Sequence, residues 1–368
     1  MTSGPARNSD FDVVIVGGGI AGASLGAEIA GRMKVLLIEA ESQCGYHSTG
    51  RSAAFWLESY GGPVVAQLTK ASLAPLTEGG FLRQRGALHI SPDATTAIAD
   101  IPDGRPVDRP ELERMIPGIR PQWRSALLEP GCADIDVAGL HAASLAAFRR
   151  GGGTLRTDAR LLSARFEDGG WTVALRDGSE VRASILVDAA GAWADSVAEA
   201  AGVAPIGIHP KRRTIVQLRV GRSGLRDLPL VSDAAETLYF KGEGDCSLWL
   251  SPHDEIATDP CDAAPEEIDI ATAIDRFEKV VDWPIERVER SWAGLRSFAP
   301  DRVPVLGFAT DSPRFFWCAG QGGFGIQTTP AAAKLSAAVL TGDAPDPLVA
   351  HIDPQPFSPS RFTRLRSS

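Results

Sequence analysis

Several features that define specialised protein classes are absent from this 368-residue sequence or scarce in it. The five cysteines are scattered and include no C-x-x-C pair, which disfavours a disulfide framework and a metal site and favours reduced thiols. No apolar run approaches the roughly 18 residues of a membrane span, so we expect no integral membrane segment. The first ten residues are polar and lack the apolar core of an export signal. We therefore expect a cytoplasmic protein.

An excess of positive charge is absent as well. Acidic residues number 46 and basic residues 37, which gives a net charge of −9, and no basic stripe offsets it. Nucleic acid is therefore not expected as a partner. The hydrophobic content of 44% and the length are those of a globular enzyme with enough residues for two domains.

The clearest positive feature is a glycine-rich turn that follows an apolar run at residues 11–16. Gly17, Gly19 and Gly22 satisfy the pattern G-x-G-x-x-G, in which each glycine has its own role. The first permits a tight turn, the second lets a pyrophosphate approach the backbone, and the third lets the following helix pack on the strand. The pattern predicts a dinucleotide bound at the N-terminus of that helix.

A second apolar run at residues 35–38 ends at Glu39, which lies 22 residues beyond Gly17. At this spacing a carboxylate typically accepts hydrogen bonds from a ribose. The same carboxylate would repel a 2′-phosphate. The sequence therefore favours FAD or NAD over NADP.

Two kinds of segment alternate along the rest of the chain. One kind consists of a strand, a glycine turn and a helix, and the other is rich in β-structure. Residues 81–130 are rich in proline and charge, and we expect them to be irregular. The pattern predicts an α/β fold with α+β inserts, in which a Rossmann-like domain built from discontinuous segments is joined to a β-rich domain. The expected helices are 64–76, 138–150, 268–281 and 329–340, with an antiparallel meander at 161–166, 171–175 and 180–183, buried strands beginning at 185 and 315, and β-rich structure at 208–249.

Four blocks of sequence are spread over nearly the whole length of the chain. The blocks are residues 17–22 with Glu39; Gly45-Tyr46-His47-Ser48-Thr49-Gly50-Arg51-Ser52-Ala53-Ala54; Leu186-Val187-Asp188-Ala189-Ala190-Gly191-Ala192-Trp193; and residues 292–301 followed by 319–328. Together they resemble the FAD-dependent amine oxidoreductases that include D-amino acid oxidase, glycine oxidase, sarcosine oxidase and D-amino acid dehydrogenases (the DAO family). Within that family the second block and Pro210-Lys211-Arg212-Arg213 are most similar to the D-arginine dehydrogenases.

The resemblance implies non-covalent FAD and a division into two domains. The FAD-binding domain would comprise residues 1–82, 136–206 and 300–368, and the substrate-binding domain residues 83–135 and 207–299. The glycine-rich turn near the C-terminus would supply backbone N–H groups to the flavin without blocking its ring. The FAD contacts that the resemblance implies are Gly17, Gly19, Ile20, Ala21, Gly22, Glu39, Ala40, Ser48, Thr49, Arg51, Ser52, Ala53, Leu161, Ala190, Gly191, Trp193, Gly320, Gly322, Gly323, Gly325, Ile326, Gln327 and Thr328.

Arg296 lies in Gly-Leu-Arg, where members of the family bind the carboxylate of the substrate. An arginine suits this role because its planar fork meets a carboxylate with two parallel hydrogen bonds. The alternative is a surface ion pair with Asp301. The other expected site residues are Tyr239 and Arg213 as further donors, Tyr60 in a lid, and Gly323.

The side-chain pocket departs from members that bind basic substrates. Where acidic or polar groups are expected, this chain has Phe55 and Ala87, flanked by Trp56 and Leu57. A buried cation without a carboxylate partner is costly, so an apolar side chain is expected instead. We name no catalytic base and interpret His47 and His89 as structural.

The resemblance implies an enzyme that oxidises the CH–NH bond of a D-amino acid by hydride transfer to the flavin. The alternatives are an N-methyl or cyclic imino acid, a 2-hydroxy acid, or a flavin-binding partner subunit without activity. The partner is a small-molecule amino acid. Oxygen, a quinone or a dye remain open as the electron acceptor.

Overall fold

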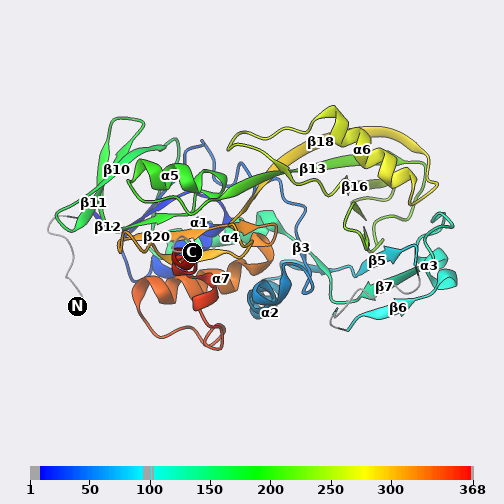
Figure 1. The fold of residues 1–368 in the computed structure, drawn as a ribbon, viewed down its shortest axis with the longest axis horizontal. Coiled ribbons are helices and arrows are strands. Elements are labelled where there is room, and N and C mark those ends of the chain that lie inside the picture. The colour runs from blue at the N-terminus through cyan, green and yellow to red at the C-terminus, as the bar shows by residue number, and fades with distance from the viewer. Residues whose placement is uncertain (1–8, 94–100, 102, 366–368) are drawn as a thin grey trace.

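Two large β-sheets and one small sheet organise the part of the chain that the computed structural model describes, residues 9–93, 101 and 103–365 (Figure 1). The expectation that the chain has no export signal rests on its first ten residues. Most of these lie outside the described residues. In Figure 1 the first sheet and α7 occupy the left half, and the second sheet with α3 and α6 extends to the right. The fold is mixed α/β, as the sequence predicts.

The first large sheet has a parallel centre in the order β9–β2–β1–β12–β20. Its apolar strands are buried on both faces, which is typical of parallel sheets covered on each side. The expected meander is confirmed, because β10, β11 and β12 pair in antiparallel fashion. The strands are β1 (Phe11–Val16), β2 (Val35–Ile38), β9 (Thr154–Arg156), β10 (Leu161–Glu167), β11 (Gly170–Leu175), β12 (Glu180–Asp188), β19 (Val305–Phe308) and β20 (Phe315–Ala319).

Helices cover one face of this sheet, where Ile15 packs with Leu25, Phe148 and Leu335. The meander and α5 cover the other face, where Trp171 packs against Leu186 and its neighbours. The expected helices are confirmed with ends shifted by a few residues. The helices are α1 (Ile20–Ile29), α2 (Gly62–Glu78), α3 (Arg109–Met115), α4 (Val137–Arg150), α5 (Ala194–Ala200), α6 (Glu267–Glu278) and α7 (Gly325–Thr341), with shorter turns η1 (Gly191–Trp193), η2 (Gln355–Phe357) and η3 (Pro359–Leu365).

The second large sheet has the order β21–β18–β13–β16–β15–β14–β5–β7–β6, and β17 pairs with β13 at one side. Its core contains Val216, Phe240 and Leu88, and Phe277 of α6 packs on it. The strands are β5 (Ala87–Ser91), β6 (Arg105–Val107), β7 (Ser125–Glu129), β13 (His209–Val220), β14 (Leu230–Asp233), β15 (Tyr239–Gly242), β16 (Ser247–Ser251), β17 (Ile256–Ala257), β18 (Ile285–Phe298) and β21 (Gln321–Gly322).

The expectation that residues 81–130 are irregular is wrong for most of the described part, which contains β4 to β7 and α3. The prolines occupy positions that regular structure tolerates. Pro106 lies on β6, which ends the sheet order and so needs fewer backbone donors. Pro110 lies in the first turn of α3, where its missing N–H leaves no bond unmade. Residues 94–100 and 102 lie outside the described residues.

A small sheet of β3 (Phe55–Trp56), β4 (Leu82–Gln84) and β8 (Ala133–Ile135) joins segments that border both large sheets. We propose the two large sheets as the cores of the FAD-binding and substrate-binding domains.

The five cysteines are free thiols. In the described part of the chain, no helix is both long and apolar enough to cross a membrane.

The packing of α1 on β1 generates a testable prediction about Gly22. A Cβ atom there would overlap the carbonyl oxygen of Gly17 and lie 3.1 Å from Cγ2 of Ile15. Gly22→Ala should therefore lower the free energy of unfolding by about 1–3 kcal/mol, measured by denaturant titration. Gly31→Ala is the control, because a Cβ at Gly31 would meet no atom within 4 Å. Equal stability of the two variants would contradict the prediction.

Candidate active site

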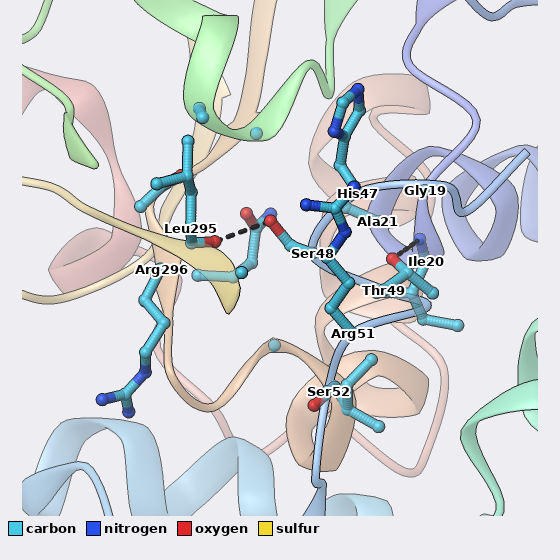
Figure 2. A pocket seen from close by; sticks show the side chains of 18 of the residues that line it. Gly19, Ile20, Ala21, His47, Ser48, Thr49, Arg51, Ser52, Leu295 and Arg296 are labelled. Atoms are coloured by element: carbon cyan, nitrogen blue, oxygen red, sulfur yellow. Dashed lines mark hydrogen bonds between the residues drawn. The ribbon is translucent and has the colours of Figure 1, made fainter. Parts of the chain in front are cut away.

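A cavity of about 820 Å³ is lined by residues from both large sheets. Its walls come from the glycine turn after β1, the segment between β2 and α2, η1, the strands β13 to β15 and the start of α7. A volume of this size is at the upper end of those that hold small molecules and cofactors. Figure 2 shows part of the lining, with Arg296 on one side and Gly19 to Ala21 on the other.

The glycine turn closes one end of the cavity. Gly17 has a φ of +109°, and a Cβ there would overlap the carbonyl of Ala189 at the end of β12. The backbone N–H of Gly18 donates to Oε2 of Glu39 at 2.8 Å, and that of Glu41 donates to Oε1 at 3.0 Å. These two bonds hold the Glu39 carboxylate in the lining, at the position expected for ribose recognition.

The segment after Glu39 connects this turn to the second sheet. Thr49 Oγ1 accepts the N–H of Ile20 at 3.0 Å, and Ser48 Oγ donates to the carbonyl of Leu295 at 2.6 Å (Figure 2). Arg51 also lines the cavity, but its guanidinium forms an ion pair with Asp262 and donates to the carbonyl of Ala263 at 2.8 Å. The side chain of Arg51 thus ties the segment before α6 to the cavity wall.

The glycine block before α7 forms the opposite wall. Gly322 has a φ of +53°, and a Cβ on Gly323 would overlap both the Arg296 guanidinium and the Tyr60 hydroxyl. Gln327 lines the cavity while its Oε1 accepts the N–H of Leu57 at 3.1 Å. Small residues therefore keep this wall open close to the guanidinium.

The residues present fit FAD. Of the contacts that the sequence implies, all line the cavity except Gly22, Gly320 and Thr328. Gly22 serves helix packing, and Gly320, at φ +72°, makes the turn between β20 and β21. Thr328 is buried and its hydroxyl donates to the carbonyl of Phe324 at 2.9 Å, inside α7. Neither Gly320 nor Thr328 reaches the cavity.

Arg296 projects into the cavity from β18, with its side chain only 13% exposed. Burial, together with the nearby charge of Arg302, lowers the pKa of Arg296 to about 9. Its guanidinium lies over the ring of Tyr60 with 5.6 Å to the centroid. The alternative pairing with Asp301 is not formed, because that carboxylate accepts from Arg361 Nε at 2.7 Å. Arg296 is therefore a buried cation that an anionic ligand would stabilise.

Glu255 is the counter-ion that several cations share. Its carboxylate contacts Arg302 at 2.8 Å and Lys211 at 3.2 Å, but Arg296 only at 3.4 Å and Arg213 only at 3.7 Å. Burial alone would raise the pKa of Glu255, but hydrogen bonds from Arg302 and Lys211 bring it down to about 2. No sequence motif indicated this residue. The two arginines that line the cavity are the least well neutralised members of the cluster.

Arg213 and Tyr239 lie near each other in the cavity wall. Arg213 Nε donates to the carbonyl of Asp254 at 2.8 Å, whereas its buried Nη2 has no hydrogen-bond partner in the described structure. Burial raises the pKa of Tyr239, and the charge of Arg213 acts in the opposite direction. Arg296, Arg213, Tyr239, Tyr60 and Gly323 all line the same cavity.

The expected side-chain pocket differs in detail. Phe55 and Leu57 line the cavity together with Leu230, whereas Ala87 is fully buried behind them and Trp56 is buried in another cluster. Ala87 does not shape the pocket surface because its small side chain lies beneath its neighbours.

The cavity lining also contains polar residues that the sequence interpretation did not assign to the site. These residues are His89, Ser59, Ser232, Glu236 and His253. His89 was interpreted as structural. It lies two residues beyond Ala87 on β5, so the two side chains face the same side of the sheet, and this spacing is the only sequence signal that pointed to His89. Among the described residues, no group of three or more His, Cys, Asp or Glu side chains is placed to hold a metal ion.

The profile of one protein family matches residues 12–339, and that family is described as FAD dependent oxidoreductase (DAO). This chain belongs to that family. FAD is the cofactor that this family membership assigns to the chain. The D-arginine dehydrogenase subtype is not established by this match.

Individual relatives are distant. The D-amino-acid oxidase of Bradyrhizobium diazoefficiens is 24% identical over 257 residues, which are 68% of this chain and 58% of that protein. FAD-dependent oxidoreductase domain-containing protein 1 of Xenopus laevis is 25% identical over 45% of this chain and 36% of that protein. The matched part of the chain thus spans between about a third and three fifths of the length of these curated relatives. The crystal structure of L-proline dehydrogenase from P. horikoshii has a TM-score of 0.82 at 21% identity, covering 97% of this chain and 99% of that chain, and shows the same fold.

We expect the FAD of this oxidoreductase to be held without a covalent bond. None of the five cysteines lines the large cavity. Acid precipitation should release a yellow supernatant with the absorbance spectrum of FAD and leave a colourless pellet. Flavin retained in the pellet would contradict this, and His47, which lines the cavity, would then be the first attachment site to test.

Proposed function

We propose that this FAD-dependent oxidoreductase oxidises the CH–NH bond of an amino acid, most simply a D-amino acid, to an imino acid that hydrolyses in water. The observation that carries the proposal is the incompletely neutralised Arg296 guanidinium, buried in the wall of the cavity that fits FAD. A carboxylate on the substrate is the ligand that such a guanidinium binds best.

The surrounding residues each have a role in this reaction. Arg296 binds one edge of the carboxylate. Arg213, whose Nη2 contacts Glu255 only at 3.7 Å, and Tyr239 line the same cavity and bind the other edge. Gly323 leaves room for the bound substrate beside Tyr60. Phe55, with Leu57 and Leu230, excludes water from the substrate side chain. When bound, FAD supplies the acceptor for the hydride.

The named relatives support amine oxidation but differ in substrate. One curated relative is a D-amino-acid oxidase, and one protein of the same fold is an L-proline dehydrogenase. The D configuration, the likeness to D-arginine dehydrogenases and the cytoplasmic location therefore remain proposals from the sequence. Oxygen, a quinone or a dye remain open as the electron acceptor.

The proposed activity is tested by anaerobic bleaching of the bound flavin. Wild-type protein is mixed with D-, L- and N-methyl amino acids, cyclic imino acids and 2-hydroxy acids, and the loss of flavin absorbance is followed. Bleaching by amino acids is expected. Bleaching by 2-hydroxy acids alone would overturn the proposed reaction, and no bleaching by any member would favour a partner subunit without activity.

Arg296→Ala should lower kcat/KM for the amino acid that bleaches the flavin by about a hundredfold or more. Loss of a charged donor from a water-poor site costs about 3 kcal/mol, and each 1.36 kcal/mol is about tenfold. Bound FAD should remain, as measured by absorbance. Arg287→Ala on the same strand is the control, because Arg287 is exposed. Unchanged turnover in Arg296→Ala would show that a residue other than Arg296 binds the carboxylate of the substrate.

Glu255→Gln should increase the affinity of the site for simple carboxylates. Removal of the shared counter-ion leaves the cationic cluster less neutralised, so the dissociation constant of benzoate should fall by about threefold or more. The measurement is the perturbation of flavin absorbance during titration. Asp259→Asn, an exposed change on the same segment, is the control. A weaker affinity for benzoate would show that Glu255 instead orients the guanidinium groups.

A further inference from the structure

Residues 259–265 form a strap that joins β17 to α6 and lies behind one wall of the cavity. The strap does not line the cavity itself. Two of its residues, Cys261 and Ala263, face a small adjoining space, while Cys261 and Asp262 are exposed to solvent. The other residues around that space all line the cavity as well, and they are His47, Ser48, Arg51, Trp193, Gly294 and Leu295. The strap is therefore the outer layer over the wall that residues 47–51, η1 and β18 form.

Few contacts hold the strap in place. Of residues 259–265 only Ala263 is buried, where it packs with Ala192, Ala293 and Leu295. No backbone hydrogen bond links residues 259–265 to another described segment. The neighbouring strand β18, in contrast, pairs with β13 along its whole length. Segments with so few buried contacts and backbone bonds open locally at low cost, so the strap opens more easily than β18.

Arg51 is the main attachment of the strap. Its Nη1 donates to the carbonyl of Ala263 at 2.8 Å, and its Nη2 forms an ion pair with the Asp262 carboxylate. The hydroxyl of Tyr46 donates to the other oxygen of that carboxylate at 3.2 Å. The hydrogen bond from Arg51 lowers the pKa of Asp262, so the carboxylate keeps its charge at neutral pH. The side chain of Arg51 is only 16% exposed, whereas that of Asp262 is 59% exposed.

The segment that carries Arg51 is attached to β18 as well. Nη1 of Arg51 also donates to the carbonyl of Ala293 at 3.1 Å, and the carbonyl of Arg51 accepts the indole N–H of Trp292 at 3.1 Å. Ser48 donates to the carbonyl of Leu295 in the same region (Figure 2). Opening of the strap would leave these bonds intact. It would remove the charged partner of Arg51 and one of its carbonyl acceptors.

These contacts join the two parts of the chain that enclose the cavity. Arg51 lies on the segment that leaves β2 of the first large sheet, and the strap leaves β17 of the second. A cofactor enclosed by both parts leaves only when they separate at some point. Segments that cover a ligand in this way commonly set the rate of its release.

We propose that residues 259–265 form a latch that retains FAD, in which Asp262 positions Arg51 at the cavity wall and FAD leaves after the strap has opened. Asp262 is a positioning residue, because it does not line the cavity and acts through Arg51. Retention of FAD in this way is independent of the substrate proposed above.

Exchange of bound FAD tests the latch without turnover. Protein loaded with FAD is mixed with an excess of isotopically labelled FAD, and the label that the protein gains is followed by rapid gel filtration. Asp262→Ala should exchange FAD about fivefold faster than wild type, the factor that corresponds to about 1 kcal/mol for an exposed ion pair. The protein should remain folded, because Asp262 is exposed.

Asp259→Ala is the matched control for this experiment. Asp259 is an exposed acid on the same strap and forms no ion pair with a described residue, so this variant should exchange FAD at the wild-type rate. An unchanged rate in Asp262→Ala would overturn the latch. Equal acceleration in both variants would overturn it too, since the effect would then follow the charge of the strap and not the contact with Arg51.

A double-mutant cycle tests whether Asp262 acts through Arg51. Arg51 lines the cavity, so its own replacement also affects FAD directly. In an Arg51→Ala background the further change Asp262→Ala should not accelerate exchange, because the contact is already lost. Full additivity of the two effects would show that Asp262 contributes independently of Arg51 and would overturn its role as the positioning residue.

Salt dependence separates the latch from the general attraction between the protein and the phosphates of FAD. Salt screens exposed ion pairs, so the exchange rate of the wild type should rise more between 50 mM and 500 mM NaCl, which are about 14 Å and 4 Å of screening length, than that of Asp262→Ala. Asp259→Ala should follow the wild type. The same salt dependence in wild type and Asp262→Ala would overturn the role of the ion pair.

Discussion

The antiparallel pairing of β13 with β18 is the constraint on which the rest of the active site depends. Residues opposite each other in such a pair share one side of the sheet, and the register sets Lys211 opposite Arg296. Arg213, two residues further along β13, therefore faces the same side and lines the cavity. Arg212 points to the other face, where it pairs with two acidic residues at the start of α6. A slip of one residue would exchange Arg212 for Arg213 and change the charge of the cavity wall.

The charge of that wall makes one part of the cavity favourable for an anion. Glu255 is shared among four cations and contacts Arg296 and Arg213 only loosely, so the cavity retains positive charge beside the place that FAD requires. Elsewhere in the lining, His89 contacts the buried Glu129 carboxylate. A carboxylate ligand is stabilised beside the two arginines, which fixes the position of that group in the cavity.

Motifs with a short-range physical origin could be predicted from the sequence. The turn at Gly17, the acid at Glu39 and the helices follow from local conformation and periodicity, and the structure has them where expected. The strands within residues 81–130 could not be predicted, because they are short and are stabilised by partners far along the chain, such as β14 for β5. Arg51 lines the cavity, but its ion pair with Asp262 depends on a segment more than two hundred residues away.

By itself the sequence determined that the chain binds a dinucleotide through a Rossmann-like unit, because glycine spacing and an acid at the end of a strand act through local backbone geometry. It also determined, through its resemblance to one family, that the dinucleotide is FAD. Only the tertiary structure decided that Arg213 and not Arg212 reaches the cavity, that Glu255 is the shared counter-ion, and that Ala87 lies beneath the surface while His89 forms part of it. These outcomes depend on strand register and on contacts between distant segments, and no local pattern of residues encodes them.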